Sequence, residues 1–428
     1  MLDWVRRWRR RGRVTLTAAR IYLGYKRTQR AVRKLPPEEA DRRWEDRHER
    51  AARLLYETAV SLRGLYIKSG QFIGTRSDLV PAPYIRWLSR LQDRVPPKPI
   101  TVIRRVIESE LGRRLEELFA EFDEEAIAAA SLAQVHRARL HDGREVAVKV
   151  QYAEIADLVR LDLANLRGLV AVVARLEPNF DYRNVVRELS AQIPLELDFE
   201  REGRMLRRVA ANLAHIEGLA FPEVVDELTT KRVLVTTFLH GERLFEPGSE
   251  RRDGPAIAQR ITEAYGHQIM VDGLFQADPH PGNFLLLPDG RIGLLDFGLT
   301  KELPDPMRRG FARLVLAAAE RNPAAIGEAF EQLGIRVRAQ SPSGVLALTQ
   351  LFFDRRPISI DGEELRLRRE TVRVNPIEAI PSDLVLLGRV VGLLRGVCAQ
   401  LGSPLSPMEM LRPFAEQVLA EEDRTSAA

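Results

Sequence analysis

The sequence of 428 residues contains a single cysteine, Cys398. One thiol cannot build a disulfide framework within the chain, so the composition favours a reducing compartment. Cys398 lies in an apolar stretch with helical spacing, and we expect it to be a buried packing residue rather than a reactive thiol. At roughly 150 residues per domain, the length predicts two or three structural units.

Long hydrophobic runs are also missing. A helix that crosses a bilayer needs about 20 largely apolar residues. The apolar stretch at 384–401 is interrupted by Arg389 and Arg395, and the one at 169–176 is short. A secretory signal needs an uninterrupted apolar segment after its basic start, and the arginines between positions 9 and 20 leave none. The sequence therefore predicts a cytoplasmic protein with no signal peptide and no transmembrane helix.

Acidic residues are nearly absent from the N-terminal arm, which we delimit at residues 1–36. Residues 1–34 hold twelve Lys and Arg residues and one acid, Asp3, so this segment carries +11 and the remainder −6 of the net charge of +5. Trp4, Trp8 and several aliphatic residues lie between the arginines, a composition that favours anionic lipid headgroups. Two interpretations stay open: peripheral attachment to the inner face of the plasma membrane, or a disordered or solvent-facing basic helix. No nucleic acid partner is predicted, because no nucleic-acid-binding motif accompanies the arm.

Hydrophobic periodicity divides the remainder of the chain into three parts, and we find no internal repeat. Residues 37–120 are predicted to form a helical extension, with helices at 38–80 and another helix at 101–119 for which Thr101 is a candidate N-cap. Residues 121–240 read as a small lobe rich in strands, and residues 241–428 as a larger, mainly helical lobe. The order predicts an α+β, bilobal fold.

Two hairpins and one long helix mark the two lobes. Each hairpin has an Asp-Gly pair between two alternating runs, which is a strong turn signal. The expected elements of the small lobe are strands at 134–140 and 145–150, a helix at 184–213, and strands at 224–225 and 232–237. The large lobe is expected to contain strands at 285–287 and 291–295, followed by helices beyond 306.

The strongest chemical signal is the sequence Gln-Ala-Asp-Pro-His-Pro-Gly-Asn at 276–283, followed by a hairpin and then Asp-Phe-Gly at 296–298. Asp278 and Asn283 have the spacing of the base and the metal-binding asparagine in a kinase catalytic loop, and Asp296 begins a DFG triplet. Phosphoryl transfer needs hard oxygen ligands for Mg²⁺ and a carboxylate that orients the nucleophile. We therefore predict Asp278 as the base or orienting residue, and Asn283 and Asp296 as metal ligands.

A second signal is Val-Ala-Val-Lys at 146–149, which matches the strand that presents the ATP lysine in kinases. In kinases this lysine forms an ion pair with a helix glutamate. We predict Glu202 as the partner of Lys149. The helical pattern also places Asp198 and Glu202 on one face, four residues apart. The alternative is an exposed acidic face of a helix.

The glycine-rich loop of typical kinases is missing. Its place is taken by an alanine-rich segment, Ala128, Ala129, Ala130 and Ser131. Glycine lets backbone amides approach phosphate closely, whereas alanine restricts the backbone and fills space. The substitution predicts altered handling of the nucleotide. Without its context, the segment could equally begin a helix.

Together with Lys-Ser-Gly-Gln at 68–71, these features resemble the UbiB family of atypical kinases, also called the AarF family, over about residues 66–395. The family has a KxGQ motif, here Lys68 and Gln71, an alanine-rich loop, and an ExD motif, here Glu196 and Asp198. The resemblance implies a protein-kinase-like fold with the KxGQ helices packed over the active site. It also implies binding of ATP and Mg²⁺, with the motif residues reaching the nucleotide, which are Lys68, Gln71, Ala128, Ala129, Ala130, Ser131, Lys149, Glu196 and Asp198.

The resemblance extends to function, with two departures. Family members are linked to ubiquinone and other isoprenoid-lipid metabolism and show little ordinary protein-kinase activity, so a lipid or quinone precursor is the implied ligand. Gln276 replaces a histidine that is common in the family's loop, and we expect little functional loss from this change. The hydrophobic C-terminal spans of some members are missing, so a membrane role rests on the basic arm or on a partner.

The leading hypothesis is an ATP-dependent atypical kinase or ATPase that acts near membranes. The segment after Gly298 lacks an Ala-Pro-Glu sequence and leaves little room for a peptide platform, which disfavours an ordinary protein kinase. A Ser/Thr protein kinase and a non-catalytic ATP-binding scaffold remain the alternatives. An aminoglycoside-type phosphotransferase shares the catalytic loop, but it does not explain Lys68 to Gln71 or the alanine-rich segment.

Overall fold

The structure is a computed structural model. It describes residues 2–74, 80–92, 96–177, 183–245, 253–337, 377–379, 381–403 and 407–426. The contacts divide the chain into two compact units: the first comprises Met1–Phe199 and Glu227–Val235, and the second comprises Glu200–Asp226 and Thr236–Ala428. The predicted domain boundaries stay predictions. None of the described helices has the length and low charge that a bilayer-spanning segment needs.

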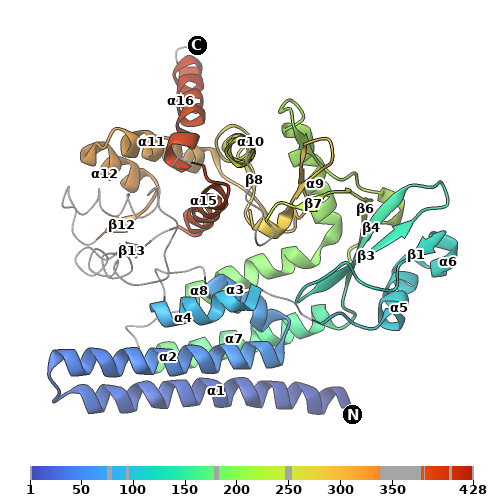
Figure 1. Cartoon of the computed structure of the whole chain (residues 1–428). Helices are drawn as coiled ribbons and strands as arrows, with labels where there is room; N and C mark the ends of the chain where they lie inside the picture. Colours follow the sequence, from blue (N-terminus) through green and yellow to red (C-terminus); the bar gives the residue numbers. More distant parts are fainter. Residues whose placement is uncertain are drawn as a thin grey trace. The chain divides into compact units, whose positions relative to one another are not determined.

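The first unit begins with a helical layer. Its elements are α1 (Leu2–Val32), α2 (Pro37–Leu62), α3 (Leu65–Gly74), α4 (Ala82–Leu88) and the short η1 (Ser89–Gln92). Helices α1 and α2 lie side by side (Figure 1), with Val14 buried and the hydroxyl groups of Thr17 and Thr58 hydrogen-bonded at 3.1 Å. The N-terminal arm is therefore an ordered helix, and the interpretation of a disordered arm is wrong.

A buried ion pair fastens α1 to the rest of the first unit. Arg10 donates to both carboxylate oxygens of Asp162 at 2.6–3.1 Å, and also to the carbonyl oxygen of Leu62. Asp162 lies on α7 (Ile155–Leu176), a helix that the sequence analysis did not predict, and its side chain is fully buried. Burial raises the pKa of Asp162, and the Arg10 guanidinium opposes that rise. Because an isolated buried carboxylate is costly, loss of Arg10 should loosen α1.

A five-stranded sheet forms the β-rich part of the first unit. Its strands are β1 (Glu121–Phe122), β2 (Ala128–Ala129), β3 (Ala133–Arg139), β4 (Glu145–Gln151) and β6 (Val233–Thr237), in the order β1-β3-β4-β6, with β2 also paired to β3. The predicted β3–β4 hairpin is confirmed, with Gly143 at a φ of +90° in its turn. Val146, Val148 and Val150 are fully buried on one face of β4.

The helix predicted at 101–119 is broken in the structure. Helix α5 (Ile100–Leu111) ends at Gly112, whose φ of +66° suits a glycine C-cap, and α6 (Leu115–Leu118) follows. Pro99 occupies the N-cap position, so Thr101 as N-cap was wrong.

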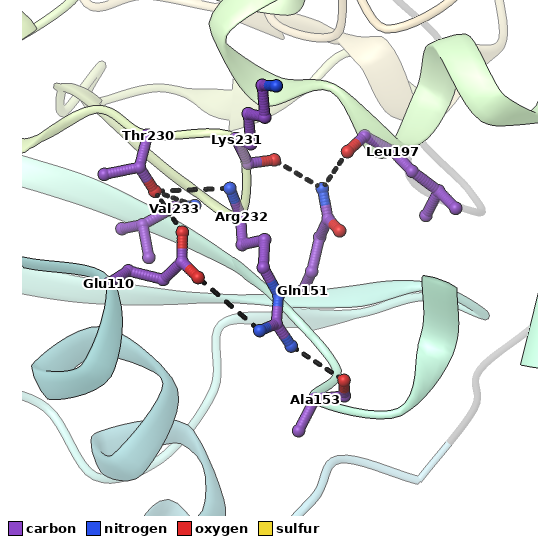
Figure 2. Close-up of polar contacts among 8 residues, drawn as sticks. All are labelled: Glu110, Gln151, Ala153, Leu197, Thr230, Lys231, Arg232 and Val233. Atoms are coloured by element: carbon purple, nitrogen blue, oxygen red, sulfur yellow. Dashed lines mark hydrogen bonds and ion pairs between the residues drawn. The ribbon is translucent and has the colours of Figure 1, made fainter. Parts of the chain in front are cut away.

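Residues 227–235, a separate stretch of the first unit, bind the end of β4 and helix α5 (Figure 2). Gln151, at the end of β4, donates to the carbonyl oxygens of Leu197 and Lys231 at 2.8 and 2.9 Å. Arg232 donates to the carbonyl of Ala153 at 2.7 Å, and Thr230 donates to the Glu110 carboxylate at 3.0 Å. Gln151 is almost fully buried, so its two bonds fix residues 197 and 231 against the strand that carries Lys149.

The hydrogen-bond partners of His136, on β3, suit its neutral form. Its Nδ1 donates to the carbonyl of Asp123 at 2.8 Å, and Gln134 Nε2 donates to its Nε2 at 2.9 Å. The Gln134 amide cannot flip freely, because its oxygen accepts from the Lys98 N–H and its nitrogen donates to the Lys98 carbonyl. A second proton on His136 would therefore face an N–H group, and burial lowers the pKa of His136.

Acidification should consequently destabilise the protein. Below pH about 6.5 the unfolded chain binds a proton at position 136 more readily than the folded chain does, so the free energy of unfolding falls as pH falls. We expect the Tm to drop between pH 7 and pH 5, and to drop less in His136→Gln. His267, whose pKa burial also lowers, should retain a share of the effect. Parallel Tm curves for wild type and His136→Gln would refute the assignment, and His141→Gln, at an exposed turn, is the control.

The helix predicted at 184–213 is in fact three elements. They are α8 (Arg183–Gln192), the 3₁₀ helix η2 (Ile193–Leu197) and α9 (Phe199–Asn212). Pro194 lies at the start of η2 and lacks the N–H that a continuing α-helix needs, and Asp198 is extended. Asp198 and Glu202 thus do not share a helix face, and that prediction was wrong.

The second unit is mainly helical around one large core. Tyr265, Phe275 and Phe284 lie in that core with relative exposures of 1% or less. Its helical elements are α9 from Glu200, η3 (Asp226–Leu228) at the unit boundary, α10 (Gly254–Gly266), η4 (His267–Val271), η5 (Pro281–Asn283), α11 (Asp305–Ala319), α12 (Pro323–Gln332), α15 (Ser382–Gln400) and α16 (Pro407–Ser426). Cys398 is buried, and burial raises the pKa of its thiol, which confirms the packing role.

The described strands of the second unit are short. They are β5 (Leu219–Ala220), β7 (Glu242–Arg243), β8 (Leu274–Gln276), β9 (Phe284–Leu286), β10 (Ile292–Leu294), β11 (Thr300–Glu302), β12 (Arg336–Val337) and β13 (Ile377–Ala379). The parallel pair β5–β10 and the hairpin β9–β10 belong to a sheet in the order β5-β10-β9-β7, and β8 pairs with β11. The hairpin predicted at 285–295 is confirmed, whereas Val224 forms only an isolated bridge to Thr236.

Candidate functional site

In the first unit, two of the predicted nucleotide residues, Lys68 and Lys149, contact positions 196–199. Lys149 lies on the face of β4 opposite the three buried valines, as predicted, and its Nζ is 5.1 Å from the centre of the Phe199 ring. Gln151, two residues along β4, binds the carbonyl of Leu197. The strand with the lysine and the segment that carries the ExD motif are therefore held together by direct contacts.

The KxGQ and ExD motifs meet in the same unit. Lys68 on α3 forms an ion pair with Glu196 at 2.7 Å, with side-chain exposures of 26% and 12%. Asp198 is half-buried at the end of η2. Gln71 lies in α3, but its side chain is outside the described residues. Sequence analysis named both charged residues as nucleotide ligands, and the structure adds that they pair with each other.

The alanine-rich segment is a strand and a turn. Ala128 and Ala129 form β2 and pair with Val135 and Gln134 of β3, and the Ala130 N–H donates to the Ala133 carbonyl at 2.8 Å. The alternative that this segment begins a helix is wrong. A hairpin with a tight turn is the geometry by which kinases cover phosphates, here with alanine and Ser131 in place of glycine.

In the second unit, one glutamine links the catalytic loop to the DFG triplet. Gln276 Nε2 donates to the carbonyls of Asp278 and Asp296 at 2.8 and 2.9 Å. Its side-chain oxygen accepts from the hydroxyl of Tyr265, which is buried and whose pKa burial raises well above its ordinary value. Gln276 thus hydrogen-bonds to groups on three segments, which indicates a structural role for this position.

The spacing between Asp278 and Asn283 closes a tight loop. Asn283 Nδ2 donates to the Asp278 carbonyl at 3.0 Å, and the Asn283 carbonyl accepts from Leu295 N at 3.1 Å. The amide nitrogen is thereby committed to the loop, so the amide oxygen is the atom that could coordinate a metal ion. The loop and the strand before the DFG triplet are joined at this residue.

Asp296 and Glu202 both lie beside Gly298. Asp296 Oδ1 accepts from the Gly298 N–H at 3.0 Å, and a Cβ at position 298 would be 3.3 Å from Asp296 Oδ1 and from Glu202 Oε2. Glu202 is 3% exposed. Arg201 donates to the carbonyls of Gly298 and Thr300 at 3.3 and 2.7 Å, which anchors the segment. The predicted ion pair between Lys149 and Glu202 stays a prediction.

These groups suit a magnesium ion that also binds phosphate. No cluster of three or more His, Cys, Asp or Glu side chains with metal-binding geometry occurs among the described residues. Mg²⁺ commonly takes only one or two carboxylates from the protein and completes its shell with phosphate and water. Asp296 and the oxygen of Asn283 fit that requirement, and Glu202 adds negative charge next to Asp296.

One residue that contacts Asp278 was not predicted from the sequence. Arg389 on α15 donates through Nη2 to Asp278 Oδ1 at 2.7 Å, across 111 positions of sequence. The side chains of Arg389 and Asp278 are 15% and 26% exposed. The sequence contained an indication of this contact, because an arginine in an apolar helix is rarely buried without an anionic partner.

The fold and the loop define a kinase-like protein. The model of the ABC1 atypical kinase-like domain matches residues 90–330. The AarF domain-containing protein kinase 1 of Xenopus tropicalis is 33% identical over 425 residues, which cover 94% of this chain and 80% of the relative. The chain belongs to the ABC1 family of atypical kinases, also called AarF or UbiB.

Two further proteins extend the comparison. The chloroplastic ACTIVITY OF BC1 COMPLEX KINASE 8 of Arabidopsis thaliana is 34% identical over 318 residues, which cover 71% of this chain and 41% of that protein. The solved structure of Rv3197 from Mycobacterium tuberculosis, in complex with erythromycin, superposes with a TM-score of 0.61 at 28% identity and covers 87% of this chain and 97% of that one. The resemblance to the UbiB family and the predicted kinase-like fold are confirmed.

Proposed function

We propose that this protein binds Mg-ATP and either hydrolyses it or transfers its γ-phosphoryl group to a small molecule or lipid. The observation that carries the proposal is a set of hydrogen bonds in the second unit that joins the loop at 276–283 to Asp296. Gln276 binds the backbone of both Asp278 and Asp296, and Asn283 closes the loop between them. The residues proposed as base and metal ligands are thus joined through one hydrogen-bonded network, which supports an arrangement suited to phosphoryl transfer.

Each residue has a role in the proposal. When bound, Mg²⁺ would neutralise charge on the phosphates, held by Asp296 and the Asn283 oxygen. Lys149 would bind phosphate oxygens, and the hairpin at 128–133 would cover them. Lys68, Glu196 and Asp198 would line the nucleotide site or restrict what reaches it, and Gln71 is assigned with them through its motif. Asp278 would accept the proton of the attacking hydroxyl group or water.

The direct test is turnover of ATP by the purified chain. Phosphate release should depend on Mg²⁺ and should respond to anionic liposomes and to quinone-like phenols, because the family resemblance points to isoprenoid lipids. Nucleotide binding without any turnover, under all of these conditions, would favour the non-catalytic scaffold. Broad phosphorylation of added proteins would instead favour a Ser/Thr protein kinase.

A membrane role is supported by one face of α1. Trp8, Leu16 and Leu23 are 55%, 52% and 53% exposed, and their spacings of eight and seven residues return to one helix face. Arg20 and Arg27 are exposed and follow the two leucines by four residues, so they lie beside them. The helix can present this face to an anionic lipid surface while its other face stays packed on α2. A role at the inner face of the plasma membrane, in ubiquinone or related lipid metabolism, belongs to this proposal.

The double variant Leu16→Ser, Leu23→Ser should bind anionic vesicles roughly tenfold less tightly, because two leucines no longer enter the interface. Reversal of charge in Arg20→Glu, Arg27→Glu should weaken binding further at low salt, by about 1 kcal/mol or more per residue. Sedimentation with phosphatidylglycerol vesicles measures both. The matched control is Val172→Ser, Leu176→Ser, which removes equally exposed apolar groups from α7. Binding that is equal in all variants, or equal on zwitterionic vesicles, would argue against a membrane surface.

A further inference from the structure

The Arg389–Asp278 contact is made from a helix that is firmly packed in the core of the second unit. Arg389 reaches the catalytic loop from α15, a helix whose inner face is closed by Leu387, Val390 and Leu394, all at most 1% exposed. The start of α15 is held by an ion pair of Asp383 with Lys301 at 2.8 Å. The helix cannot move away without opening the core, so the guanidinium is presented to Asp278 by a rigid element.

The catalytic loop has no strong cation of its own. Between Asp278 and Asn283 the sequence holds only His280 as a basic residue, and its Nδ1 accepts a hydrogen bond from the Gly282 N–H. An ionised carboxylate in a half-buried loop needs a charged or hydrogen-bonding partner. Arg389 is that partner, and it occupies Oδ1 only. The second oxygen, Oδ2, has no contact with Arg389 within hydrogen-bond distance.

We propose that Arg389 is a positioning residue for Asp278 in phosphoryl transfer, an inference that rests on the proposed function. By binding Oδ1, Arg389 fixes the orientation of the carboxylate and leaves Oδ2 to face the attacking group. In the step, the oxygen of water or of an acceptor hydroxyl forms a bond to the γ-phosphorus. The bond from that phosphorus to the bridging oxygen breaks, its electron pair leaves with ADP, and the acceptor proton passes to Oδ2.

The guanidinium also has donors to spare. Arg389 Nε is buried and has no hydrogen-bond partner among the described residues. Asp278 is a quarter exposed, so the ion pair does not seal the loop. An inhibitory ion pair that blocked Asp278 would be expected to bury its carboxylate and to hydrogen-bond both of its oxygens. The geometry therefore favours a positioning contact over an inhibitory one.

Arg389→Ala should lower kcat for ATP about 100-fold with little change in KM, because the base loses its orientation but the nucleotide ligands remain. Arg389→Lys keeps the positive charge but lacks the planar guanidinium, so its kcat should lie between those of wild type and Arg389→Ala. Guanidinium chloride at non-denaturing concentration should restore turnover of Arg389→Ala at least about tenfold by filling the vacated position. Thermal unfolding monitors the fold, and Arg412→Ala, at an exposed ion pair on α16, is the control.

Two further readouts separate positioning from mere stability. If Arg389 acts through Asp278, adding Arg389→Ala to Asp278→Asn should cost no further activity, whereas independent roles would give additive losses. Affinity for Mg-ADP, measured by calorimetry, should stay within about twofold, and affinity for ADP with aluminium fluoride should fall about tenfold.

The outcomes distinguish the two proposals. If wild type has no ATP turnover, the proposed function fails and this inference fails with it. If wild type turns over ATP and Arg389→Ala or Arg389→Lys is equally fast or faster, only the positioning role is overturned. Additive losses in the double variant, or no rescue by guanidinium in a folded Arg389→Ala protein, would overturn it as well.

Discussion

Asp278→Asn is expected to abolish most ATP turnover, with a loss in kcat of roughly 10²–10⁴-fold. Asparagine has nearly the same shape, so the loop hydrogen bonds to the Asp278 carbonyl from Gln276 and Asn283 are preserved. The amide cannot accept the proton of the attacking group, and it leaves the Arg389 guanidinium without its anion. Mg-ATP affinity should change far less than kcat, because Asp278 is not assigned to bind the nucleotide. Phosphate release and calorimetric binding on one preparation measure the two quantities.

The matched control removes a carboxylate from another arginine. Asp305 pairs with Arg308 at 3.0 Å in the first turn of α11, and its side chain is 64% exposed. Asp305→Asn should therefore leave turnover unchanged. If Asp278→Asn kept wild-type turnover, the loop would not supply the base and the enzymatic interpretation would lose its main support.

The parts of the site that sequence could predict are the local ones. Strand β4, with its lysine opposite three valines, follows from a period of two residues. The hairpin between Asn283 and Asp296 follows from Asp-Gly, and the spacing of five between Asp278 and Asn283 corresponds to a loop closed by the asparagine side chain. These features depend on a few consecutive residues, so the sequence pattern alone defines them.

The predictions from sequence that were wrong or missing concern the extent of helices. The pattern at 184–213 has helical spacing throughout, yet Pro194 and an extended Asp198 divide it. Helix α7 was not predicted, although its buried positions Ile155, Val159 and Leu163 recur at intervals of four residues. Periodicity shows which residues can share a face, but it does not show where tertiary contacts make a break favourable.

The contacts least accessible from sequence join distant positions. Lys68 and Glu196 were both named as nucleotide ligands through the family motifs, and only the structure shows that they pair. Arg10 looked like one basic residue among many in the arm, but it binds the buried Asp162. Arg389 looked like an interruption of an apolar helix. A charged residue in an apolar stretch signals a partner, but the sequence does not say which one.

Asp296→Asn is expected to weaken the binding of Mg-ATP at least about tenfold while leaving metal-free binding nearly unchanged, because a carboxylate ligand is replaced by a neutral amide. The variant retains an oxygen that can accept the Gly298 N–H, so the turn of the DFG triplet is kept. Calorimetric titration with ATP, in Mg²⁺ and in EDTA, measures the difference. Glu202 lies near the same glycine, so its negative charge should keep part of the metal dependence.

The hairpin turn supplies a control with the same local geometry. Asp289 Oδ1 accepts from the N–H of Arg291, two residues later, at 3.0 Å, just as Asp296 accepts from Gly298, but Asp289 is exposed. Asp289→Asn should therefore leave nucleotide affinity unchanged with and without Mg²⁺. If Asp296→Asn behaved like this control, Asp296 would serve only its turn, and the metal would have to be bound by other groups. A loss confined to the Mg²⁺ titration can come only from a lost ligand, because misfolding would lower both affinities together.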